Sequence, residues 1–242
     1  MKKILCLTFV FLLAAGSAFA SDQAVLAAGG GYKKMVNALA RAYTAETGNS
    51  LQLVYGNMGR VTAQARNSGA VDLVIGADFF LTRAQLDFSE EMKLGRGKLV
   101  LAWSKSFKGG IDPAAMLESA AAKRVATPDP HKAIYGRAAA QYLKHTGLDA
   151  RVGDRLVEVA AIPQVFSYLS LNEVDLGFMN LTHTLNVLDS LGGYVVIPDE
   201  TYKPIFIMAG QLANASHPKQ AQDFYRFLKT DKAQKIIRAN GL

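Results

Sequence analysis

Hydrophobic residues recur along the chain with two different periods, which predicts short strands separated by amphipathic helices. An apolar stretch at residues 24–28 is followed by three glycines and then by a segment with apolar residues at helical spacing that stops at Gly48. The pattern then repeats, because residues 51–55 begin with the alternation of a strand and residues 60–67 have helical character. This part of the chain therefore predicts two successive strand–turn–helix units.

The same alternation continues to the end of the chain. Residues 73–75 form an uninterrupted apolar run, which is typical of a parallel strand covered by helices on both faces. A helix is predicted at residues 133–145, ending at Gly147, and two short amphipathic helices follow Pro218. Further strands are predicted at residues 98–103, 124–127, 156–159, 176–179, 194–197 and 205–208. The pattern predicts an α/β fold.

Residues 1–20 have the pattern of a secretory signal peptide. Lys2 and Lys3 precede an apolar run over residues 4–15, and Ala18-Phe19-Ala20 fits a small-x-small cleavage site. The run falls short of the roughly 20 residues of a membrane-spanning helix. Cleavage after Ala20 would also remove Cys6, the only cysteine, and with it any disulfide, cysteine nucleophile or thiolate metal site. We therefore expect a free, exported protein.

Composition and charge narrow the range of ligands. The chain has 242 residues, 50% of them hydrophobic, and its net charge of +7 falls to +5 without Lys2 and Lys3. The basic residues are scattered, so a nucleic-acid surface is not expected, although a small anion would be weakly attracted.

Residues with catalytic chemistry are sparse in this sequence. The four histidines lack metal-ligand spacing, and Glu90-Glu91 are predicted to lie in a solvated loop. An exported enzyme that uses Asp78, Asp129 or His131 on loops stays open as an alternative, and product formation from anionic esters would distinguish it from a binding protein. We expect no catalytic residues, no cofactor and no metal site.

Glycine-rich turns precede two of the predicted helices. Gly29-Gly30-Gly31 and Gly56-Asn57-Met58-Gly59 each lie between a strand and a helix, and a third helix follows the segment from Asp129 to Ala133. Unpaired N–H groups at helix N-termini bind anions, so three such ends could converge on one oxyanion. Tight turns without a ligand remain the alternative for each glycine motif alone.

Several short blocks, in this order and at this spacing, resemble the periplasmic molybdate-binding proteins of ABC transporters over nearly the whole chain after residue 20. The blocks are Ala27-Ala28; Gly56-x-x-Gly59 with Ala63-Gln64; residues 71–78; Asp129-Pro130 with residues 133–138; Leu176-Gly177-Phe178; Phe227-Leu228; Ala233-Gln234; and Gly241. The resemblance implies a two-lobed solute-binding fold with two chain crossovers between the lobes. It also implies a monomer that captures molybdate or tungstate in the cleft, as the only bound metal, and delivers it to a membrane permease.

The resemblance further implies which residues contact the ligand. Two serine hydroxyls of the family are matched here by Gly30, beside Gly31, and by Met58, beside Asn57, and a family tyrosine is matched by Asn180. Lys132, Ala133 and Ile162 would donate backbone N–H groups. Because the hydroxyls are replaced, a protonated oxyanion, or another small anion bound by a receptor of this fold, stays open as the ligand.

The lobes are expected to be formed by discontinuous segments. Lobe 1 is predicted to contain residues 21–102 and 204–242, and lobe 2 residues 103–203. The connecting strands would be residues 98–103 and 202–208, and closure of the lobes about them would bury the ligand.

Overall fold

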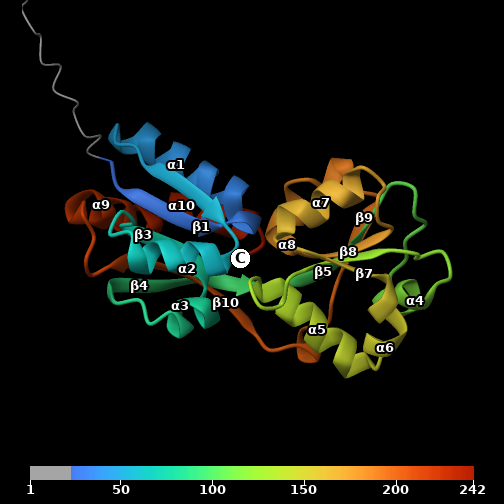
Figure 1. Cartoon of the computed structure of the whole chain (residues 1–242). Coiled ribbons are helices and arrows are strands. Elements are labelled where there is room, and N and C mark those ends of the chain that lie inside the picture. The colour runs from blue at the N-terminus through green and yellow to red at the C-terminus, as the bar shows by residue number, and fades with distance from the viewer. Residues whose placement is uncertain (1–22) are drawn as a thin grey trace, which may run out of the picture.

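The computed structural model describes residues 23–242, so the predicted signal peptide lies outside the described residues. The chain forms two lobes that lie side by side, each built on a five-stranded mixed sheet flanked by helices (Figure 1). The predicted two-lobed α/β fold is therefore confirmed. Among the described residues, no helix is both long and apolar enough to cross a bilayer.

Lobe 1 holds the sheet with strand order β2-β1-β3-β10-β4. Strand β1 pairs in parallel with β2 and β3, whereas β10 runs antiparallel to β3 and β4. The strands are β1 (Val25–Gly29), β2 (Gln52–Gly56), β3 (Leu73–Ala77), β4 (Phe88–Gly97) and β10 (Ile205–Leu212). The helices are η1 (Gly30–Tyr32), α1 (Lys33–Thr47), α2 (Met58–Asn67), α3 (Asp78–Arg83), α9 (Pro218–Leu228) and α10 (Asp231–Ala239).

Lobe 2 repeats the arrangement with strand order β7-β6-β8-β5-β9, in which β5 runs antiparallel to β8 and β9. Helices α5 and α7 cover opposite faces of this sheet (Figure 1). The strands are β5 (Leu99–Trp103), β6 (Val125–Pro128), β7 (Leu156–Val159), β8 (Leu176–Asn180) and β9 (Gly193–Val196). The helices are α4 (Pro113–Glu118), α5 (Ile134–Thr146), α6 (Asp149–Val152), η2 (Gly153–Arg155), α7 (Ile162–Ser170), α8 (Leu181–Leu185), η3 (Leu188–Ser190) and η4 (Asp199–Thr201).

Strand β4 corrects one expectation from the sequence. Glu90 and Glu91 were predicted in a solvated loop, but both lie in β4, at the edge of the sheet, opposite Gln211 and Gly210 of β10. Their charges occupy successive positions of an edge strand, where charged side chains discourage pairing with other chains. Because the two adjacent carboxylates are typical of a solvated loop, this strand was not predicted from the sequence, although its burial alternates along its length.

The chain passes into lobe 2 at Lys98, between β4 and β5, and returns between β9 and β10. Strand β5 belongs to the second sheet, so the first chain segment of the lobe 1 sheet ends at Gly97, ahead of the boundary expected at residue 102. The Tyr202 hydroxyl accepts a hydrogen bond from the Leu99 N–H at 3.1 Å and donates one to Asp199 at 2.9 Å. The bond between Tyr202 and Leu99 ties the two connecting segments together, while the bond to Asp199 holds the Tyr202 hydroxyl within its own segment.

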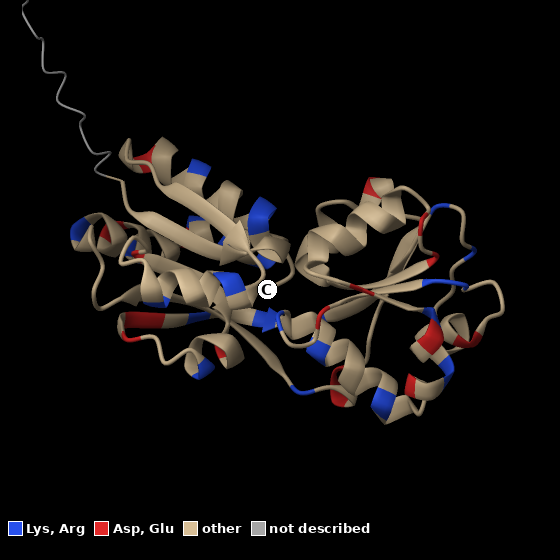
Figure 2. Cartoon of the chain, in the orientation of Figure 1, with Lys and Arg blue, Asp and Glu red and all other residues tan. Residues whose placement is uncertain are grey.

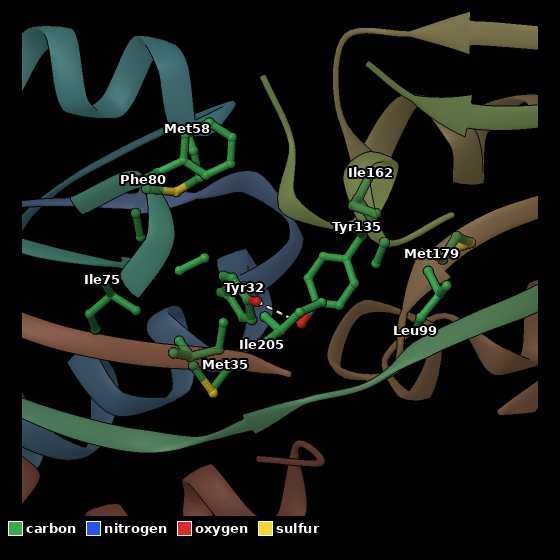
Figure 3. Close-up of a cluster of buried hydrophobic side chains, with 14 of the residues drawn as sticks. Tyr32, Met35, Met58, Ile75, Phe80, Leu99, Tyr135, Ile162, Met179 and Ile205 are labelled. Atoms are coloured by element: carbon green, nitrogen blue, oxygen red, sulfur yellow. Dashed lines mark hydrogen bonds between the residues drawn. The ribbon is translucent and has the colours of Figure 1, made fainter. Parts of the chain in front are cut away.

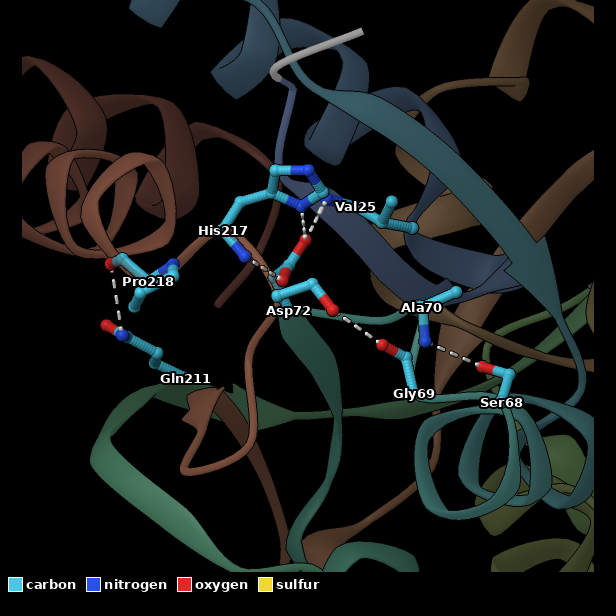
Figure 4. Close-up of polar contacts among 9 residues, drawn as sticks. Val25, Ser68, Gly69, Ala70, Asp72, Gln211, His217 and Pro218 are labelled. Atoms are coloured by element: carbon cyan, nitrogen blue, oxygen red, sulfur yellow. Dashed lines mark hydrogen bonds and ion pairs between the residues drawn. The ribbon is translucent and has the colours of Figure 1, made fainter. Parts of the chain in front are cut away.

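A buried carboxylate organises the far end of lobe 1. Asp72 is fully buried and accepts hydrogen bonds from the N–H groups of Val25, at 2.7 Å, and His217, at 2.8 Å (Figure 4). The His217 Nδ1 lies 3.0 Å from the same carboxylate. Asp72 therefore links the start of β1, the start of β3 and the start of α9.

Candidate functional site

A small cavity lies between the two lobes, at the ends of the strands that carry the predicted turns. Its volume is about 30 Å³, which is the space of a few water-sized groups. No side chain with a formal charge lines it. The lining residues, all in the described part of the chain, are Gly29, Gly30, Gly31, Tyr32, Gly56, Asn57, Met58, Ala77, Ala133, Ile134, Tyr135, Ala161 and Ile162. Most of the predicted ligand-contact residues are therefore brought together here.

The first glycine turn brings lobe 1 close to lobe 2. A Cβ at Gly30 would lie 3.4 Å from Pro163, and a Cβ at Gly31 would lie 3.0 Å from the Asn180 side chain. A contact of 3.0 Å is shorter than ordinary van der Waals packing, so Gly31 permits an approach that a larger residue would obstruct. Gly30 has no positive φ and could carry a side chain.

In the second turn, the Asn57 side chain and the Met58 N–H form hydrogen bonds with other groups of the protein. The Asn57 Oδ1 accepts from the Arg60 N–H at 2.9 Å and caps α2, while the Met58 N–H donates to the Lys132 carbonyl across the lobes at 3.1 Å. The Met58 side chain is buried in lobe 1, where a Cβ at Gly76 would lie 2.3 Å from its terminal carbon. In this arrangement the Asn57 Oδ1 and the Met58 N–H are already occupied.

In the third turn, Asp129 binds the amides of the residues that follow it. The Asp129 carbonyl accepts hydrogen bonds from the N–H groups of Lys132 and Ala133 at 3.1 and 2.9 Å. Its carboxylate accepts from the His131 N–H at 2.8 Å and lies 2.6 Å from the Lys132 Nζ. The bond to Lys132 lowers the pKa of Asp129 and leaves the carboxylate a weak base.

The amides available to a ligand at this turn therefore begin at Ile134, two residues after Lys132, where the prediction began. Ile134 and Tyr135 are the first two residues of α5, so their N–H groups have no acceptor within the helix. Ile162 stands in the same position at the start of α7 and is followed by Pro163, which has no N–H. Together with Gly30 and Gly31, these residues bring helix N-termini from both lobes to one cavity.

Two tyrosines that line the cavity form a polar cluster with a neighbouring asparagine, and neither tyrosine was predicted from the sequence. The Tyr32 and Tyr135 hydroxyls are 2.9 Å apart and join the two lobes (Figure 3). Asn180 is fully buried and donates through Nδ2 to the Gly31 carbonyl at 3.2 Å. Burial raises the pKa of both tyrosines, so their hydroxyls stay neutral. Tyr135 lay within the Ala133–Ala138 block, but nothing in the sequence marked Tyr32 as its partner.

The arrangement supplies neutral hydrogen-bond donors to an anion. Neutral N–H groups at helix N-termini stabilise an oxyanion through hydrogen bonds and helix dipoles. Among the described residues, no group of three or more His, Cys, Asp or Glu side chains is placed to hold a metal ion. Asp129, one of the three catalytic candidates from the sequence, has its carboxylate held by the Lys132 Nζ and the His131 N–H.

Comparisons with known proteins agree with this geometry. The family model described as bacterial extracellular solute-binding protein matches residues 24–242. A molybdate-binding protein of Azotobacter vinelandii is 29% identical over 95% of this chain and 92% of its own length. One from Rhodobacter capsulatus is 24% identical over 92% of this chain and 88% of its own length.

Among solved structures, the periplasmic molybdate-binding protein of Azotobacter vinelandii superposes with a TM-score of 0.81 and 26% identity. The match covers 90% of this chain and 98% of that protein.

Proposed function

Because the chain belongs to the family of bacterial extracellular solute-binding proteins, we propose that it captures a compact tetrahedral oxyanion, molybdate or tungstate, between its lobes. The convergence of unpaired backbone amides from both lobes on one small cavity carries the proposal. Names of relatives that cover most of this chain support molybdate as the ligand.

The lining favours a small, fully charged ligand over an organic one. Glycine, alanine and isoleucine dominate the cavity, so selectivity depends on the positions of N–H groups and on size. A volume of about 30 Å³ excludes a large organic solute unless the lobes separate. An oxyanion accepts hydrogen bonds on every side and satisfies donors that come from both lobes at once.

The ligand would then be passed to the membrane permease of an ABC transporter, without turnover. The protein acts as an exported monomer after cleavage behind Ala20, which N-terminal sequencing of the purified protein tests. A mature chain that begins at Met1 contradicts this part of the proposal.

Isothermal titration with molybdate, tungstate, sulfate and phosphate tests the ligand. Ile134→Pro removes a single amide donor. Proline suits the first position of a helix, and the preceding Ala133 already has the extended backbone (φ −136°, ψ 128°) that proline requires. A lost bond to a charged acceptor is worth about 1.5–3 kcal/mol, so molybdate affinity should fall at least tenfold.

Ile134→Val is the matched control, because it trims the side chain and keeps the N–H. Its affinity should stay within about twofold of the original, as expected for a change that leaves every hydrogen bond in place. Binding of no anion by the unmodified protein, or equal molybdate affinity in the proline and valine variants, contradicts the proposal.

A further inference from the structure

A second groove lies at the junction of the lobes, outside the small cavity. It is formed by α3 of lobe 1, α5 of lobe 2 and the returning segment before β10, and its volume is about 610 Å³. The two spaces share only Ile134 among their lining residues. The groove is lined by Asp78, Phe79, Thr82, Arg83, Ile134, Arg137, Ala138, Gln141, Lys203, Pro204 and Ile205.

Positive charge dominates this groove. Arg83, Arg137 and Lys203 line it, against the single carboxylate of Asp78. None of the three basic side chains forms an ion pair or a hydrogen bond with any described residue. Figure 2 shows basic residues on both lobes beside their junction.

Arg137 is the most informative of the three. Its side chain is partly buried, and its guanidinium lies 4.2 Å from the centre of the Phe79 ring, so a residue of lobe 2 rests on a ring of lobe 1. The ring face attracts the cation but does not accept its N–H groups as a carboxylate or phosphate does. A partly buried guanidinium without a carboxylate therefore lacks its usual partner.

We propose that this groove binds a small anion with at least two carboxylate or phosphate groups. One group pairs with Arg137 above Phe79, and a second reaches Lys203. The groove is within the usual size range of small-molecule sites. Bidentate pairing with a guanidinium suits both anionic groups.

The position of the groove gives this ligand an effect on the cleft. It contacts lobe 1 through α3 and lobe 2 through α5, so it favours the closed arrangement. A ligand that favours the closed arrangement raises the affinity for any other ligand that binds only that arrangement. By linkage, each ligand raises the affinity for the other by the same factor. The second anion therefore tightens binding of the oxyanion in the cavity.

Titration of the full exported chain with citrate and with inorganic pyrophosphate, without molybdate, tests the site and separates carboxylate from phosphate. At least one probe should saturate, and Arg137→Gln and Lys203→Gln should each weaken it about fivefold or more. Lys203 is exposed, so its substitution tests the site without disturbing the core. Lys105→Gln, an exposed lysine outside the groove, is the matched control and should leave affinity unchanged.

Three outcomes overturn the proposal. Neither probe saturates, or both groove variants bind like the unmodified protein, or Ile134→Pro weakens the probe while Arg137→Gln does not, which places the probe in the cavity. Failure of molybdate to bind, with citrate or pyrophosphate still dependent on Arg137, refutes the proposed function alone. The expected coupling is a lower dissociation constant for molybdate when the probe is present.

Discussion

The hydroxyl oxygens of Tyr32 and Tyr135 lie 2.9 Å apart, and the first belongs to lobe 1 while the second belongs to lobe 2. Both rings are buried, and the bond exists only while the two lobes are together, because it joins one lobe to the other. The bond from Asn180 to the Gly31 carbonyl crosses the same boundary. Hydrogen bonds between the two lobes therefore support closure, in addition to those a ligand provides.

Replacement of Tyr135 by phenylalanine should weaken ligand binding without unfolding the protein. A neutral hydrogen bond contributes about 0.5–1.5 kcal/mol, so molybdate affinity should fall about two- to tenfold. Isothermal titration measures the change, and a urea titration checks stability. Tyr194→Phe, on β9 away from the cleft, is the control and should bind like the unmodified protein. Unchanged affinity in Tyr135→Phe would show that the hydroxyl pair does not stabilise the closed form.

Serine substitutions at Gly30 and Met58 should have different effects. A side chain at Gly30 meets only ordinary contacts with Pro163, so Gly30→Ser can add a hydroxyl donor and tighten molybdate binding about tenfold. Met58 packs within lobe 1, so Met58→Ser should cost about 2–5 kcal/mol of unfolding free energy, as other large-to-small core changes do. Titration and urea unfolding of both single variants separate these effects. A stable Met58→Ser protein with tighter binding would instead show that position 58 faces the ligand.

Stability should decrease in mild acid because of His183. Burial first, and Lys34 second, lower the pKa of this side chain to about 4, against 6.5 for an unperturbed histidine. The unfolded chain therefore takes up the proton at a higher pH than the folded one, and stability is lost as the pH falls from about 6.5 to 4. The loss attributable to His183 is at most about 3 kcal/mol.

Urea unfolding at pH 7 and pH 4.5 measures this loss. His183→Leu should depend less on pH than the unmodified protein, whereas His145→Gln, at an exposed position, should not differ from it. An identical pH dependence in all three proteins would exclude His183 as the source.

Asp72→Asn should destabilise lobe 1 by about 2–3 kcal/mol, because an amide N–H₂ would face donors that the carboxylate now satisfies. Urea unfolding measures the change, and Asp154→Asn, on the exposed surface, is expected to have no effect. Molybdate affinity should be retained, since Asp72 does not line the cavity. A stability equal to that of the Asp154 variant would contradict this role.

The fold was largely predictable because its strongest signals are local. The uninterrupted apolar run in β3 is fully buried, as predicted, and α1 and α5 end at Gly48 and Gly147 in the left-handed conformation. Strand β4 was missed because an edge strand carries charges at positions that a covered strand fills with apolar residues. Short helices such as α3 and α8 give too few turns for a periodic pattern.

The site was less predictable, because whether a backbone N–H group is free to bind a ligand depends on which other groups of the folded chain lie beside it. The sequence placed the glycine turns and the start of α5 near one another, but Lys132 and Ala133 donate to Asp129 within their own loop. The Met58 N–H bonds to the Lys132 carbonyl, more than seventy residues away in the chain. The Tyr32–Tyr135 pair spans 103 positions, and no local pattern encodes it.

The position of β10 in its sheet also sets the order in which the lobes can be completed during synthesis. Every strand of lobe 2 precedes Ile205, so that sheet is complete once β9 has left the ribosome. In lobe 1, β10 lies between β3 and β4, so these strands have no shared neighbour until the chain reaches Leu212. The lobe that contains the start of the described chain is therefore the second to be finished.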